Sequence, residues 1–216
     1  MTFRLHGDSG QAAPLYIAAV VGLLFLALMF FAFGQADIRR NETQTAADAA
    51  ALAAAKDSRD GLEEDLHLNV LDPDWLKNLV NGVVRSPEAG CAEASRFAAE
   101  NDARNIGCAP LADGRWGVTV KVKSEKPVGK SIVEGTEGQH AEATATAVVE
   151  SRCIFEPNEA TEKPPTDSED EDPEKEEEKP SPGQFSCDGE KWVIDPMRLD
   201  LLPDMADLFD VHLAED

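Results

Sequence analysis

The chain has 216 residues, of which 20 are Lys or Arg and 42 are Asp or Glu, so its formal net charge is −22 at pH 7. This balance argues against nucleic acid or an anionic membrane surface as a partner, because phosphate recognition needs clustered Lys and Arg, and the sequence has no such patch. It also has no cofactor-binding motif and no catalytic constellation, so we expect neither a cofactor nor a bound metal nor enzymatic activity.

An uninterrupted apolar segment covers residues 12–33. At about 1.5 Å rise per residue, a helix of about 22 residues is about 33 Å long and matches a hydrocarbon core of about 30 Å. We therefore expect a single transmembrane helix over residues 12–34, preceded by a cytoplasmic tail, residues 1–11. A cleaved secretory signal is the alternative, but its apolar part is shorter, about 7 to 15 residues, and ends at a small-x-small site. An uncleaved anchor is favoured.

An alanine-dense segment follows the apolar run. Alanine has the highest helix propensity, so the membrane helix is predicted to continue through residues 35–61 and to stop at Gly61. Side chains this small allow another helix or a sheet to approach closely, which makes the extension either a solvated linker or a packing spine. Within the span, Ala18 and Gly22 form a small-xxx-small notch for a neighbouring helix. The candidate packing residues of the extension are Ala46, Ala47, Ala50, Ala51 and Ala54.

Residues 62–155 have the pattern of a small α+β domain. Asp72 and Pro73 are a typical N-cap and first-turn pair for a short helix over residues 74–81. A second helix is predicted over residues 86–103. Alternating apolar residues then predict two half-buried strands. Their inward positions are Trp116, Val118, Val120 and Val122 in the first strand, and Ala141, Ala143, Ala145, Ala147 and Val149 in the second.

Much of the negative charge lies in residues 156–183, which contain almost no apolar side chains. Such a segment cannot bury enough surface to offset its chain entropy, and its like charges repel, so we expect an acidic disordered insertion that acts as a tether. The turn-forming Gly and the terminal bidentate carboxylate of a tight Ca²⁺ site are missing from its acidic run. The last piece, residues 184–216, is too short to fold alone and is expected to dock back on the domain.

Four cysteines lie after the span, at Cys91, Cys108, Cys153 and Cys187. None belongs to a close C-x-x-C pair typical of a zinc or redox site, so disulfides formed in an oxidising compartment are the best interpretation. We expect one disulfide between Cys153 and Cys187, at the two feet of the acidic insertion. We expect the other between Cys91 and Cys108, joining the second helix to the first strand.

The charges beside the span do not decide its orientation, since Arg4 precedes it while Arg39 and Arg40 follow it. The cysteines favour an oxidising side for everything after the span. We therefore expect a single-pass protein of the cell membrane with a cytoplasmic N-terminus and a disulfide-stapled extracytoplasmic domain.

The order of Gly10, an apolar span and the run QTAADAAALAAA, residues 44–55, resembles the TadE/TadG-type proteins of the Tad (tight adherence, Flp pilus) assembly system. The resemblance covers about residues 8–56. It implies a membrane-anchored, pseudopilin-like structural component of a pilus assembly or secretion machine. The implied partners are the membrane and other pilus or secretion-system subunits, and the N-terminal helix is a candidate surface for self-association.

One departure from the family pattern affects the expected mechanism. Pilin-like members are cleaved after a Gly that is followed by a Glu and an aromatic residue, which makes Gly10-Gln11 the candidate cleavage site. Here Tyr16 is present, but Leu15 stands where the Glu is expected. We therefore expect inefficient cleavage and an accessory role rather than that of a major pilin. The alternative function is a membrane-anchored extracytoplasmic binding or sensing module unrelated to pili.

Overall fold

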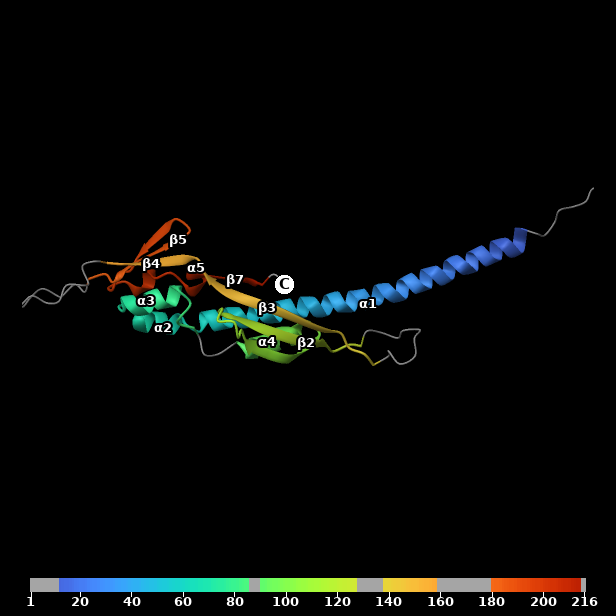
Figure 1. Ribbon diagram of the computed structural model, residues 1–216, viewed down its shortest axis with the longest axis horizontal. Coiled ribbons are helices and arrows are strands. Elements are labelled where there is room, and N and C mark those ends of the chain that lie inside the picture. Colours follow the sequence, from blue (N-terminus) through green and yellow to red (C-terminus); the bar gives the residue numbers. More distant parts are fainter. Residues whose placement is uncertain (1–11, 86–89, 128–137, 159–179, 215–216) are drawn as a thin grey trace, which may run out of the picture.

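The computed structural model describes residues 12–85, 90–127, 138–158 and 180–214. Its fold is α+β, as predicted: a long helix, α1, projects from an elongated domain that contains two antiparallel sheets and short helices (Figure 1). The helices are α1 (Ala12–Asp60), α2 (Glu63–Asn69), α3 (Pro73–Val80), α4 (Cys91–Glu100), the 3-10 turn η2 (Leu199–Leu201) and α5 (Met205–Leu208). The strands are β1 (Ala103–Pro110), β2 (Gly117–Ser124), β3 (Glu142–Ser151), β4 (Cys153–Pro157), β5 (Gly183–Cys187), β6 (Glu190–Val193) and β7 (Phe209–Leu213).

The helix α1 is continuous over 49 residues, from the apolar run through the alanine-dense segment. At about 1.5 Å per residue, it is about 74 Å long. It ends at the predicted stop, where the Gly61 N–H donates to the Asp57 carbonyl at 2.9 Å. The predicted helical extension is therefore confirmed.

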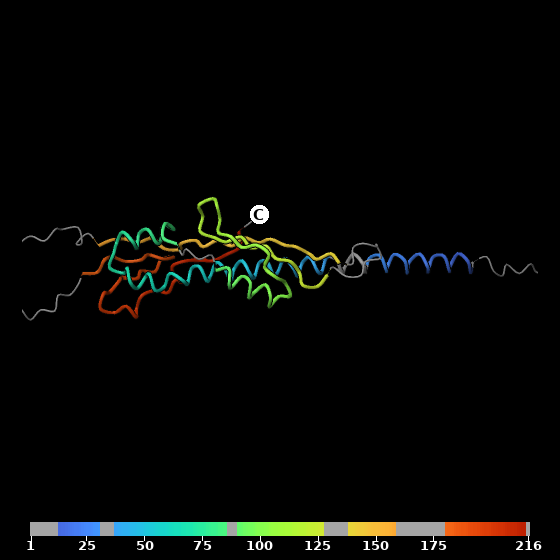
Figure 2. The backbone as a smooth tube through the Cα atoms, turned by 90° about the horizontal axis from the view of Figure 1, so that it is seen from below, coloured from blue at the N-terminus to red at the C-terminus, as the bar shows by residue number. Residues whose placement is uncertain are grey.

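The main sheet has four strands in the order β1-β2-β3-β7, and each neighbouring pair is antiparallel. Both strands predicted from alternation are present as β2 and β3, with Val120 opposite Ala145. Their inward side chains face α1, which contacts β2, β3 and β7, while α4 contacts α1 and β1 (Figures 1 and 2). The domain body is thus two layers, with the two helices on one face of the sheet.

A second sheet, in the order β4-β5-β6, lies with α2 and α3 at the end of the domain far from the projecting helix (Figure 1). Phe155 of β4 is directly opposite Phe185 of β5, and their ring centroids are 5.5 Å apart. The chain then returns to the main sheet as β7, which pairs with β3. There Phe209 packs edge-on against Trp116 at 5.2 Å. The C-terminal segment therefore docks by completing both sheets.

One predicted helix is shorter than expected, and two short elements were not predicted. The second helix, α4, begins at Cys91 and ends at Glu100, and residues 86–89 are outside the described part of the chain. Asp102 has a φ of 54°, and this left-handed turn redirects the chain so that Ala103 begins β1. Neither α2 nor β1 was predicted. Both are short, and β1 is not a clean alternation because its register shifts between Asn105 and Gly107.

The acidic insertion is also shorter than residues 156–183. Glu156 and Pro157 complete β4, and Gly183 begins β5, because backbone pairing between these strands continues to Pro157 and Gly183. Beyond them the Asn158 N–H donates to the Pro182 carbonyl at 3.0 Å. Residues 159–179, on which the expected disorder falls, are outside the described residues.

Candidate assembly interface

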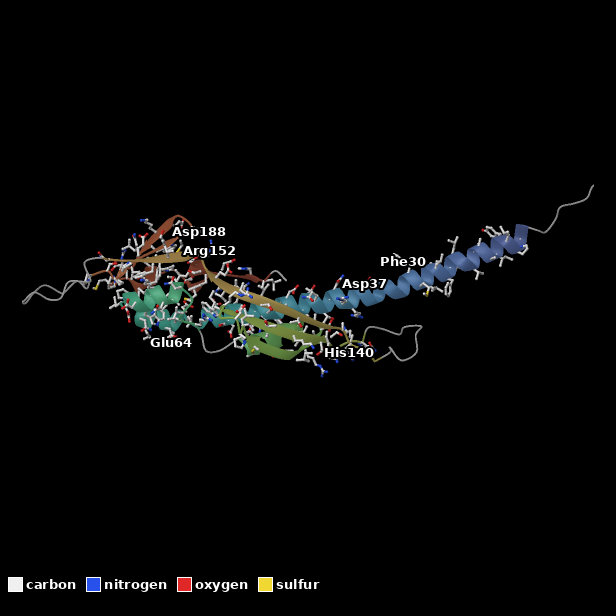
Figure 3. All side chains as sticks on the ribbon, viewed as in Figure 1. Phe30, Asp37, Glu64, His140, Arg152 and Asp188 are labelled. Carbon is white, nitrogen blue, oxygen red and sulfur yellow. A yellow bond between two sulfur atoms is a disulfide. The ribbon has the colours of Figure 1, made fainter. Side chains whose placement is uncertain are left out.

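The first half of α1 is an exposed apolar surface (Figure 3). Its segment Ala13–Phe30 has a mean hydropathy of 2.4, and none of it is buried. Leu15 is 77% exposed and Phe30 is 83% exposed. By length and composition it is the one helix among the described residues that could cross a membrane. A soluble domain rarely presents an apolar surface of this extent without a partner or a lipid phase to cover it.

The predicted notch lies on this exposed half of α1. Ala18 is exposed, and a Cβ added at Gly22 would meet no atom within 4 Å. The notch is therefore open in the isolated chain and has room for a second helix. The candidate cleavage site, Gly10-Gln11, is outside the described residues.

The second half of α1 is the core of the domain. The alanines expected to form a packing surface are fully buried, each 0% exposed: Ala46, Ala47, Ala50, Ala51 and Ala54. Their partners are the chain's own main sheet and α4. A solvated linker is therefore the wrong interpretation of this segment. The buried face of the helix begins at Thr43.

This face needs small side chains because the backbone at the start of α4 lies close to it. Gly90, at the N-terminus of α4, has a φ of 61°, and a Cβ placed on it would overlap the Ala54 carbonyl group. Nearer the distal end, the buried Ser58 hydroxyl accepts a hydrogen bond from the Trp116 indole N–H at 3.1 Å. Small side chains thus permit close packing, and one buried polar pair fixes the position of the helix beneath β2.

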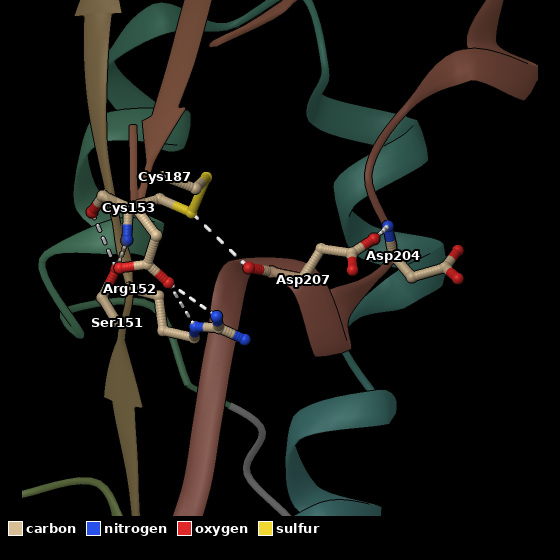
Figure 4. Close-up of a disulfide and its surroundings, with 7 residues drawn as sticks. Ser151, Arg152, Cys153, Cys187, Asp204 and Asp207 are labelled. Carbon is tan, nitrogen blue, oxygen red and sulfur yellow. Dashed lines mark hydrogen bonds and ion pairs between the residues drawn. A yellow bond between two sulfur atoms is a disulfide. The ribbon is translucent and has the colours of Figure 1, made fainter. Parts of the chain in front are cut away.

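The two disulfides join the expected cysteines. Cys91 is bonded to Cys108, which ties the start of α4 to β1. Cys153 is bonded to Cys187, directly across the β4–β5 pair, at the end of the two strands that lies away from the acidic insertion and not at its feet. The Cys153 sulfur also lies 3.7 Å from the Asp207 carbonyl oxygen of α5 (Figure 4). Both crosslinks therefore hold elements that the sequence separates by a turn or by the insertion.

Charged pairs lie on the outer surface of the sheets. The Lys121 and Lys123 ammonium groups are 2.9 and 3.2 Å from the Glu142 carboxylate and lower the pKa of that carboxyl. Near the Cys153–Cys187 disulfide, the Arg152 guanidinium is 2.6 Å from the Asp188 carboxylate, which raises the pKa of Arg152 (Figure 3). These pairs are solvent-exposed, so their contribution to stability is small.

The described residues contain no group of three or more His, Cys, Asp or Glu side chains placed to hold a metal ion. One hollow of about 420 Å³ is lined in part by Glu156, Ser181 and Val193.

One exposed edge was missed at the sequence level. The terminal run Phe209-Asp210-Val211-His212-Leu213 was recognised only as a source of apolar anchors, yet it forms β7, the last strand of the main sheet. Its strict alternation of apolar and polar residues is the signal that predicts a half-buried strand.

Comparison with known proteins agrees with the resemblance seen in the N-terminal run. Residues 10–57 match a family model described as Tad, putative Flp pilus-assembly TadE/G-like. No curated protein and no solved structure matches the chain. The matched segment takes in both the exposed apolar half of α1 and the alanine half that forms the core of the domain. Over residues 10–57 the chain is thus similar to the TadE/G-like family of putative Flp pilus-assembly proteins.

Proposed function

We propose that the protein is a structural accessory subunit of a Tad-type pilus assembly or secretion machine, anchored in the cytoplasmic membrane and acting through protein–protein contacts. The observation that carries the proposal is the construction of the family-matched segment. It is one helix, exposed and apolar over Ala13–Phe30, and buried in the domain along the alanine face that includes Ala46, Ala50 and Ala54. The anchoring helix is therefore part of the folded domain and is not joined to it by a flexible linker.

The continuity of α1 couples the membrane to the domain mechanically. Because the helix enters the domain core without a break, a subunit that displaces the embedded half of α1 also moves the whole domain. The open notch at Ala18 and Gly22 is the contact surface that we propose for another machine subunit or for a second copy. Small residues at this spacing let two helix backbones approach closely within lipid.

The orientation that we propose places the domain outside the cytoplasm. The domain contains two disulfides, and disulfides persist in oxidising compartments. The N-terminus is then cytoplasmic. With Leu15 where pilin-like members have Glu, the tail is proposed to be retained, without efficient cleavage between Gly10 and Gln11.

Photo-crosslinking in the producing cells tests the proposal. A photoreactive residue at Val21, next to the notch, is expected to crosslink to other pilus-machine subunits, identified by mass spectrometry. The same residue at Leu68, which is 74% exposed on the distal α2, serves as the matched control for capture by the domain surface. Crosslinks from Val21 to lipid alone, together with normal surface fibres after deletion of the gene, would favour the anchored binding module instead.

A further inference from the structure

The edge of β7 carries backbone groups that the described chain does not pair. The Ala214 N–H donates to Thr146 and the Arg152 N–H donates to the Leu208 carbonyl, both at 2.9 Å. In an antiparallel pair the bonding direction alternates along the strand, so the N–H and C=O groups of Val211 and Leu213 face away from β3. No described residue hydrogen-bonds to them, whereas the Phe209 carbonyl next to them accepts from Arg59 at 3.4 Å.

The opposite edge of the same sheet is built differently. In β1 the register shifts between Asn105 and Gly107, and Pro110 lacks an N–H, two features that discourage pairing with another strand. The five residues of β7 contain no Pro and no Lys, and their pairing with β3 is regular. The β1 edge of the sheet therefore discourages pairing with another strand, whereas the β7 edge is free to pair.

The side chains of β7 define what an added strand would meet. On the inner face, Val211 and Leu213 are half-buried and pack against the core. On the outer face, Asp210 lies directly opposite Glu150 of β3, an unfavourable pairing of like charges. His212 Nδ1 is 3.3 Å from the Asp210 carboxylate, but His212 bears a charge only when protonated.

A hollow of about 610 Å³ opens beside this acidic pair. Its lining residues are Glu150, Ser151, Arg152, Asp188 and Asp210. The one fixed cation in the lining, Arg152, pairs with Asp188 at 2.6 Å (Figure 3) and interacts with Asp210 only at longer range. The exposed carboxylates of Glu150 and Asp210 therefore still offer a favourable site for a further cation from outside the described chain.

We propose that the free edge of β7 binds an extended segment of a partner protein by strand addition. The added strand hydrogen-bonds to Val211 and Leu213, directs apolar side chains toward α1, and places a Lys or Arg side chain in the hollow beside Glu150 and Asp210. The inference concerns the domain alone and does not depend on a pilus role. A short, charged edge that only prevents aggregation is the competing explanation, and it predicts no binding.

The probe is a fluorescently labelled, blocked pentapeptide, Val-Lys-Val-Lys-Val, titrated against the full-length protein in detergent micelles. The expected result is binding by fluorescence anisotropy, with slower amide hydrogen exchange in β7. The matched peptide Val-Glu-Val-Glu-Val is expected to bind at least about tenfold more weakly, because it brings like charges to the hollow. Absence of binding at millimolar peptide, or equal binding of the two peptides, would overturn the proposal.

Two variants locate the site. Val211→Pro removes an outward N–H without breaking the β3 ladder, and it is expected to abolish binding. Val193→Pro is its control, since the Ile194 N–H donates to Gly183 and the neighbouring Val193 N–H therefore points to the free side of β6. It is expected to leave binding unchanged. Loss of binding in the control alone would move the site to β6 and refute the assignment.

A charge variant keeps the test independent of proline. Glu150→Gln combined with Asp210→Asn is expected to weaken binding of the Lys peptide about threefold to tenfold, the range for loss of a hydrogen bond or ion pair. A Val-Thr-Val-Thr-Val peptide should bind this variant and the wild type equally. Unchanged affinity for the Lys peptide in a variant with native thermal stability would contradict the role of the hollow.

Discussion

At the scale of single residues, the backbone of Gly90 lies close against that of Ala54. A Cβ on Gly90 would overlap the Ala54 carbonyl, so glycine is needed both for space and for the positive φ of 61°. This contact sets the distance between α4 and α1. It also explains why α4 begins at Cys91: the left-handed residue before it cannot be part of the helix.

Gly90→Ala should therefore destabilise the domain more than Gly82→Ala. Gly82 has a similar φ of 67°, but a Cβ there would meet nothing within 4 Å. The Gly82 change is expected to cost about 1–2 kcal/mol from backbone strain alone. The Gly90 change should cost about 1–3 kcal/mol more, from the steric overlap. Chemical unfolding of both variants measures the difference, and equal losses would contradict the close contact.

Ala50→Trp tests the core role of the alanine face. Ala50 is fully buried among the main sheet and α4, so a large ring cannot be accommodated, and we expect a loss of at least about 3 kcal/mol or failure to fold. Thr45→Trp, at an exposed position of the same helix, should leave the melting temperature nearly unchanged. Thermal unfolding followed by circular dichroism checks both. A solvated alanine helix would tolerate the two changes equally.

At the scale of elements, the two disulfides close loops of different length, with sequence separations of 34 and 17 residues. In the loop-entropy model each contributes about 3–4 kcal/mol. The paired change of Cys153 and Cys187 to Ser should cost about 0.6 kcal/mol more than that of Cys91 and Cys108, because the longer loop is doubled in length. Denaturant unfolding of the two double variants gives the comparison, and the reverse order would indicate that strain or packing dominates.

The β4–β5 hairpin should be stable without the acidic insertion. The end beside the insertion is closed by the Asn158–Pro182 hydrogen bond and the other end by the Cys153–Cys187 disulfide, and all of these groups lie outside residues 159–179. Replacing residues 159–179 by a short Gly-Ser linker should change the free energy of unfolding by no more than about 1 kcal/mol, since loop entropy varies slowly with length. A larger loss in denaturant unfolding would show that the insertion packs on the domain or binds a cation.

At the scale of the whole molecule, charge is distributed unevenly along the long axis. The acidic insertion leaves from the end that also carries α2 and the second sheet, opposite the apolar half of α1 (Figure 1). In the proposed orientation, this end of the domain lies on the far side from the membrane.

Labelling with a membrane-impermeant maleimide tests this orientation. The native cysteines in the described domain are all in disulfides, so an introduced thiol is the reactive group. In intact spheroplasts, Leu68→Cys at the distal end should be labelled at once. Ser9→Cys, in the expected cytoplasmic tail, should be labelled only after lysis. Labelling of Ser9→Cys and not of Leu68→Cys in intact spheroplasts would reverse the proposed topology.

By itself, the sequence determined the local properties of the chain. Helix propensity predicts α1 to its last turn, alternation predicts β2 and β3, and the Asp72-Pro73 pair predicts the start of α3, where the Asp72 carboxylate accepts from two backbone N–H groups. These features depend on residues near one another in the chain. The two expected cysteine pairs are present as well, although Cys108 lies in β1, a strand that the sequence did not predict.

Only the tertiary structure decided which surfaces meet. The alanine run predicts that something approaches closely, but whether that is a neighbouring subunit or the chain's own sheet depends on segments about 40 to 170 residues away, from α4 to β7. The same holds for the left-handed Gly90, which only the approach of Ala54 requires, and for β7, whose open edge exists because the last strand pairs with β3. Propensity and periodicity act over a few residues, whereas burial is a property of the assembled whole.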